Sequence, residues 1–166
     1  MTKLLERTIL YMLILLQLFG LAYAQAKIEP LPIEMLADSM NQKPKAILVL
    51  VATDWCSYCQ LQKARMAKSK ELRDVSQYVY YVELSAEAKD TIVFDGQPYS
   101  YLNNGPSSGI HELAVHLAEE HGRVAYPTLV LLDNNYQVVF RFQGLLSKDA
   151  TKALNNYFRM LSARKM

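Results

Sequence analysis

The chain has 166 residues, of which 51% are hydrophobic and 20% are charged, and its formal net charge is +2. This length is enough for one domain with a substantial core, and the composition excludes an intrinsically disordered chain. A net charge so close to zero gives no strong field for nucleic acid or anionic lipid, so neither is expected as a partner.

Residues 1–24 have the pattern of a secretory signal peptide. Two basic residues, Lys3 and Arg7, precede a long uncharged apolar run that ends at Ala22-Tyr23-Ala24, which has small residues at the two positions that signal peptidase reads. The alternative is an uncleaved N-terminal membrane anchor, because the uncharged run is nearly long enough to span a bilayer. Residues 25–166 are expected to form one folded domain.

The only two cysteines of the chain, Cys56 and Cys59, lie between a predicted strand and a predicted helix. The strand is the apolar run 46–52, which is rich in β-branched residues. The helix is indicated by the strong helix formers at 60–68. An earlier helix is expected over 33–40, where apolar residues recur at helical spacing.

This position predicts reactive thiols. A helix N-terminus presents unpaired N–H groups and a partial positive charge, which stabilise a thiolate at Cys56 and lower its pKa below the usual value of about 8.5. Cys59 lies one turn further and can close a disulfide with Cys56. A bridge across two residues constrains little of the unfolded chain, so we expect a working disulfide and not a structural one.

A strand is predicted over 78–84, and a long segment separates it from the next buried strand. A β-hairpin is expected within 91–101, because Asp95-Gly96 is a turn pair that tolerates positive φ at both central positions. A loop over 103–109 and a helix over 110–120 follow. We hypothesise that this inserted segment selects partners; the alternative is an edge hairpin without that role.

Three histidines, His111, His116 and His121, are candidate metal ligands. Their spacings of five residues do not place them on one helix face, unlike the i, i+4 pair of a zinc helix. Two of them could complete a four-ligand site with Cys56 and Cys59. Surface or capping histidines are the preferred interpretation, and no metal site is predicted.

The C-terminal part of the chain is predicted to form a β-hairpin followed by a helix. Tyr126-Pro127 precedes an apolar strand over 128–132, and a second strand over 137–142 follows a polar turn. A last helix over 147–163, capped by Ser147, keeps its apolar residues at helical spacing.

The sequence resembles the thioredoxin-like family over about residues 27–164. The resemblance is carried by the strand before Trp55-Cys56-Ser57-Tyr58-Cys59, the helix after it, and Tyr126-Pro127 at the start of a later strand. It implies an α/β thioredoxin fold, a central mixed sheet flanked by helices, with an inserted β-hairpin and loop near residues 91–109. The Cys-Ser-Tyr-Cys motif and the long insertion are similar to exported, periplasmic thiol-disulfide oxidoreductases of the Bacteroidetes type.

The resemblance also implies roles for five residues. Cys56 would be the nucleophile and Cys59 the resolving thiol, with no cofactor beyond their redox-active disulfide. Trp55 would pack beside the disulfide and shape the approach of substrate; plain core packing is the alternative. A cis bond before Pro127 would leave the Tyr126 backbone facing a substrate strand and keep metal off the thiols.

The chain departs from the family pattern at two positions. The buried acidic residue expected six positions before the first cysteine is Leu50, and the helix proline expected five positions after the second cysteine is Ala64. The usual route for proton transfer is therefore missing, and water or Glu83 are the candidate substitutes.

The expected function is thiol-disulfide exchange with protein thiols and disulfides in the periplasm, with a membrane electron donor as a further candidate partner. Contact with the membrane is expected only through an uncleaved signal segment. Two alternatives are a redox-inactive binding or chaperone module of the same fold, and a metal-binding carrier. The sequence does not distinguish reductant, oxidant and isomerase.

Overall fold

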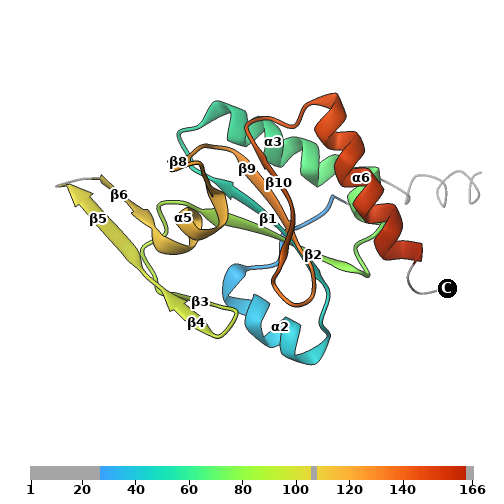
Figure 1. Cartoon of the computed structure of the whole chain (residues 1–166), viewed down its shortest axis with the longest axis horizontal. Coiled ribbons are helices and arrows are strands. Elements are labelled where there is room, and N and C mark those ends of the chain that lie inside the picture. Colours follow the sequence, from blue (N-terminus) through green and yellow to red (C-terminus); the bar gives the residue numbers. More distant parts are fainter. Residues whose placement is uncertain (1–26, 106–107, 164–166) are drawn as a thin grey trace, which may run out of the picture.

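The computed structural model describes residues 27–105 and 108–163 (Figure 1). The predicted signal peptide, residues 1–24, lies outside the described residues. Within the described part of the chain, every helix is too short or too polar to cross a membrane.

The centre of the fold is a four-stranded mixed sheet. Its strand order is β10-β9-β1-β2, with β1 and β2 parallel and the other neighbours antiparallel. Every residue of β1 is buried, as expected for an apolar run between two covering layers. The strands are β1 (Ala46–Ala52), β2 (Val79–Ser85), β9 (Thr128–Leu132) and β10 (Val138–Gln143).

Helices cover both faces of this sheet (Figure 1). Side chains alternate along β1, so that Ile47, Val49 and Val51 join one core with the first helices and α5, while Leu48 and Leu50 join a second core with α3, α4 and α6. The helices are η1 (Ile33–Met35), α2 (Leu36–Gln42), α3 (Ser57–Lys68), α4 (Lys70–Asp74), α5 (Glu112–Ala118) and α6 (Lys148–Ala163). The predicted arrangement, a mixed sheet flanked by helices, is confirmed.

The inserted segment forms two hairpins. The first joins β3 (Ile92–Phe94) to β4 (Gln97–Tyr99) through Asp95 and Gly96, which both have positive φ as the turn pair predicts. The second joins β5 (Tyr101–Gly105) to β6 (Ser108–His111) and projects from the rest of the fold (Figure 1).

The prediction of a loop over 103–109 is therefore wrong for the described residues of that range, which belong to β5 and β6. The described residues between Leu102 and Ile110 are Asn, Ser and Gly, and each is exposed or only partly buried, so they lack the alternation that reveals a half-buried strand. A Cβ at Gly109 would collide with the Tyr101 ring, so glycine at this position lets that ring pack across the β5–β6 hairpin, called the β5–β6 ribbon below.

The predicted helix over 110–120 is also too long. Ile110 and His111 end β6, and the helix begins only at Glu112, because the His111 ring accepts a hydrogen bond from the Leu113 N–H and caps the helix. At the other end, Glu119–Glu120 forms β7, which pairs with β8 (Arg123–Val124).

Candidate active site

Cys56 and Cys59 form a disulfide at the junction between β1 and α3, with their Cα atoms 5.2 Å apart. Cys56 is the N-cap residue of α3, and its Sγ accepts a hydrogen bond from the Cys59 N–H at 3.1 Å. Cys59 is completely buried, whereas 9% of Cys56 is exposed. A partner thiol or disulfide therefore reaches Cys56 first, and a negative charge on its sulfur would face a backbone donor at a helix N-terminus.

The side chains beside the disulfide are aromatic and open to solvent. Trp55 is 72% exposed and Tyr58 is 63% exposed, so Trp55 is not a core residue. The Trp55 ring meets the Tyr126 ring edge to face, with centroids 6.4 Å apart. These rings give the site an apolar contact surface next to Cys56.

Pro127 lies beside the same end of β1. The antiparallel register pairs Val51 with Thr128. Pro127, the residue before Thr128, therefore lies next to the C-terminal end of β1, which leads to the cysteines. The peptide bond between Tyr126 and Pro127 is cis. The fold thus brings together all five residues that the resemblance singled out, from positions more than 60 residues apart in the chain.

Glu87 is a further residue of this site. Its carboxylate oxygen Oε1 accepts a hydrogen bond from the Trp55 indole N–H at 3.1 Å. Burial raises the pKa of Tyr126, and the negative charge of Glu87 raises it further. Glu87 was not predicted, although one signal was available: it follows a strand that runs parallel to β1, and parallel strands end at the same edge of a sheet.

Beneath the site, Leu50 is fully buried, and its register partner on β2 is Glu83. The Glu83 carboxylate accepts a hydrogen bond from the Tyr81 hydroxyl at 2.8 Å and lies 3.3 Å from Lys63 Nζ on α3. Burial first, and then the charge and hydrogen bond of Glu83, strongly raise the pKa of Tyr81. A carboxylate is therefore present on the strand next to Leu50, and its charge is neutralised by Lys63.

The three histidines have separate environments. His111 is fully buried; its Nδ1 accepts from Leu113, so its Nε2 carries the proton and donates to the Asp90 carbonyl at 3.0 Å. The His116 ring lies against Tyr99, and His121 occupies a turn with positive φ. Within residues 27–105 and 108–163, no three His, Cys, Asp or Glu side chains are grouped so as to hold a metal ion.

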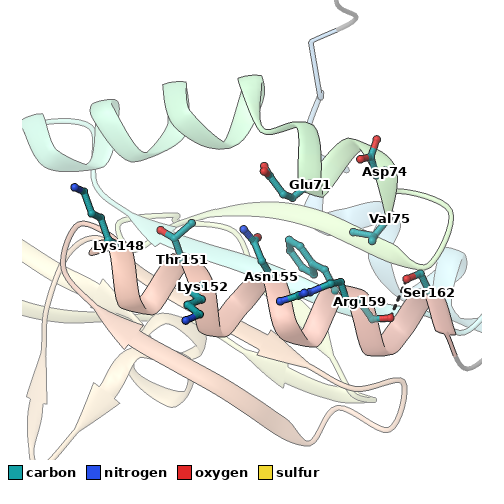
Figure 2. Close-up of a pocket in the computed structure, with 10 residues that line it drawn as sticks. Glu71, Asp74, Val75, Lys148, Thr151, Lys152, Asn155, Arg159 and Ser162 are labelled. Carbon is teal, nitrogen blue, oxygen red and sulfur yellow. Dashed lines mark hydrogen bonds between the residues drawn. The ribbon is translucent and has the colours of Figure 1, made fainter.

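A groove of about 580 Å³ lies elsewhere, between α4 and α6. Figure 2 shows Glu71 and Asp74 on one side and Lys148, Lys152 and Arg159 on the other. None of the residues around the disulfide lines this groove. None of the side chains that line it is a thiol or another redox-active group, so the redox chemistry is assigned to the disulfide site.

A mixed sheet with a Cys-x-x-Cys disulfide at a strand–helix junction and a cis-proline beside it defines the thioredoxin class of folds. A family model described as "Thioredoxin-like domain" matches residues 34–159, and the chain belongs to this family. The predicted thioredoxin fold is thereby confirmed. No curated protein matches the sequence.

Three solved structures that are similar to this chain are distant from it in sequence. One described as "DsbH Oxidoreductase" is 15% identical, with a TM-score of 0.50, and the match covers 82% of this chain and 88% of that one. Thioredoxin f2 from Chlamydomonas reinhardtii is 21% identical, with a TM-score of 0.47 and coverage of 78% and 94%. A mutant thioredoxin from Halobacterium salinarum NRC-1 is 19% identical, with a TM-score of 0.46 and coverage of 78% and 90%.

Proposed function

We propose that this protein is a thiol-disulfide oxidoreductase that exchanges disulfides with exported proteins. The observation that carries the proposal is that the two cysteines differ in exposure to solvent and in hydrogen bonding. Cys56 reaches the surface at a helix N-terminus and accepts a backbone N–H, while Cys59 is buried within bonding distance of it. One thiol is placed to meet a partner and the other to resolve the product.

The reaction follows from this placement. In the reduced protein, the Cys56 thiolate attacks one sulfur of a partner disulfide and forms a mixed disulfide, and the partner's other sulfur leaves as a thiolate that takes up a proton. The Cys59 thiolate then attacks the Cys56 sulfur and releases the second partner thiol. The partner gains two electrons and two protons, and the Cys56–Cys59 disulfide is formed. The reverse sequence oxidises a partner dithiol.

The partner would lie over Trp55 and along the chain at Tyr126 and Pro127. Pro127 has no N–H, and the exposed Trp55 ring offers an apolar surface beside Cys56. These features support contact with an extended segment around the reactive cysteine of a partner protein.

The proposed location is the periplasm. It rests on the signal pattern of residues 1–24 and on the need for an oxidising compartment in which a cysteine pair persists as a disulfide. A donor or acceptor of the dithiol–disulfide class, in the membrane or soluble, would be needed to return the pair to its starting state.

The test is the reduction potential of the Cys56–Cys59 pair, measured on the full chain in mild detergent with glutathione and dithiothreitol redox buffers. A reversible two-electron couple is expected. A value near about −270 mV would mark a reductant, and a value near about −120 mV an oxidant. If no intramolecular disulfide forms anywhere in this range, the proposal fails and a redox-inactive binding module is favoured; stoichiometric zinc on the thiols would favour a metal carrier.

A further inference from the structure

Glu87 connects the aromatic surface beside the disulfide to the loop that follows β2. Its carboxylate accepts the Trp55 indole N–H at 3.1 Å, and Trp55 in turn meets Tyr126 edge to face. The Glu87 backbone N–H donates to Ser85 Oγ at 3.3 Å, which fixes the start of the loop. A partner segment lying on Trp55 and Tyr126 would therefore pass close to the Glu87 carboxylate.

The charge of this carboxylate is not neutralised by the neighbouring cations. Among residues 27–105 and 108–163, no lysine, arginine or histidine forms an ion pair with Glu87. The basic residue nearest in sequence, Lys89, lies 3.3 Å from the centre of the Tyr101 ring instead. Burial raises the pKa of Tyr126, and the Glu87 charge raises it further, so this charge acts on a ring of the surface on which the partner would lie.

We propose that Glu87 is a specificity-determining residue, which makes the site prefer partner cysteines flanked by a lysine or arginine over those flanked by an acidic residue. This inference rests on the proposed thiol-disulfide exchange. Covering Glu87 with a partner removes water from the carboxylate, so a cation nearby compensates the lost hydration and an anion adds repulsion. The effect is screened by salt because the carboxylate is exposed.

The hydrogen bond that Glu87 accepts from Trp55 and the negative charge of Glu87 can be separated by substitution. Glu87→Gln keeps an oxygen that can accept the Trp55 indole N–H but removes the charge, whereas Glu87→Ala removes both. The chain has a single tryptophan, so its fluorescence reports on Trp55 alone. Unchanged emission in Glu87→Gln with altered emission in Glu87→Ala would show that the hydrogen bond survives in the first variant. Glu34→Gln, an exposed glutamate in η1, is the matched control.

The experiment uses three disulfide-linked peptides that are identical except for Lys, Gln or Glu next to the reactive cysteine. The reduced full-length protein, in mild detergent, is mixed with each peptide, and the exchange rate is followed by stopped-flow fluorescence of Trp55. We expect the wild-type rate for the Lys peptide to exceed that for the Glu peptide about three- to tenfold at low ionic strength. This ratio should fall to near one in Glu87→Gln and in about 0.5 M salt, and persist in Glu34→Gln.

The ratio cancels any change in the intrinsic reactivity of Cys56, because that change affects all three peptides equally. A ratio that is the same in wild type and Glu87→Gln would overturn the role of Glu87 and leave the proposed function intact. Absence of exchange with all three peptides would overturn the proposed function, and with it this inference.

Discussion

The central sheet and the inserted hairpins are held in place by different forces. β1 is covered on both faces, and all seven of its residues are buried in two apolar cores. The β5–β6 ribbon pairs only with itself and leaves most of its residues at least partly exposed. The first region is stabilised by burial of apolar surface, whereas a two-stranded ribbon of this kind has little stability of its own.

The ribbon is joined to the site by a short hydrogen-bonded path. The His111 N–H donates to the Ala86 carbonyl at 2.8 Å, and the Ala86 N–H donates to the Ala52 carbonyl at 2.8 Å, four residues before Cys56. The difference between the two regions indicates that the chemistry depends on the sheet, and that the insertion depends on a few polar contacts near its base. Each region should therefore tolerate changes that damage the other.

The largest expected effect is on the chemistry of the sheet region. Cys56→Ser should reduce exchange at least about a thousandfold, because the hydroxyl is a poor nucleophile at neutral pH. Cys59→Ser should instead accumulate a mixed disulfide between Cys56 and the partner peptide, because the resolving thiol is gone. Mass spectrometry and the stopped-flow assay measure the two outcomes. Comparable activity in Cys56→Ser would show that the chemistry does not depend on this cysteine.

The second expected effect is on the base of the insertion. His111 is fully buried and both of its ring nitrogens are hydrogen bonded, so His111→Ala should lower the free energy of unfolding by about 2–4 kcal/mol. Urea unfolding followed by circular dichroism measures this. His116→Ala, at an exposed position of α5, is the histidine control; it removes only a ring contact with Tyr99 and should cost less than about 1 kcal/mol. Equal losses would mean that His111 does not anchor the insertion.

The third effect concerns a polar network on the α3 side of the sheet, Tyr81–Glu83–Lys63. The pKa of Tyr81 is raised above its usual 10.0 by burial and by Glu83, so above pH 10 the unfolded chain loses this proton while the folded protein keeps it. The stabilisation is complete below pH 10 and falls by about 1.4 kcal/mol per pH unit above it.

Tyr81→Phe isolates this contribution. At pH 8 the wild type should be more stable than Tyr81→Phe by about 1–2 kcal/mol, because the variant lacks the hydrogen bond to the Glu83 carboxylate. Urea unfolding of both proteins at pH 8 and pH 11 should show this difference shrinking at the higher pH. A difference that is constant with pH would mean that Tyr81 titrates normally in the folded protein.

The difference between the central sheet and the inserted hairpins also explains which elements could be predicted from the sequence. The four sheet strands and α6 follow from long apolar patterns, and the cysteines and Pro127 carry their own chemical signals. The buried face of α3 was not apparent, since Gln62 is buried and accepts the Leu146 N–H while Leu61 is 43% exposed. The β5–β6 ribbon and Glu87 depend on contacts between distant segments, which leave no periodicity in the chain.

The smallest expected effect comes from shortening the ribbon. In an antiparallel ladder, hydrogen-bonded residue pairs alternate with pairs that are not hydrogen bonded. The His111 N–H donates to the Ala86 carbonyl, so Tyr101 and His111 are not a hydrogen-bonded pair. The next pair, Leu102 and Ile110, is therefore the hydrogen-bonded pair that a two-residue turn can connect. Replacing residues 103–109 by Asn-Gly should form a type I′ turn there and remove the tip of the ribbon.

This variant keeps His111 and its contacts with Asp90 and Leu113, so its free energy of unfolding should change by less than about 1 kcal/mol. Its exchange rate with a small disulfide such as oxidised glutathione should remain within about twofold of wild type. A large loss of stability would show that the ribbon contributes to the core fold. A large loss of exchange with normal stability would place the ribbon tip in the chemistry, and the separation between sheet and insertion would then fail.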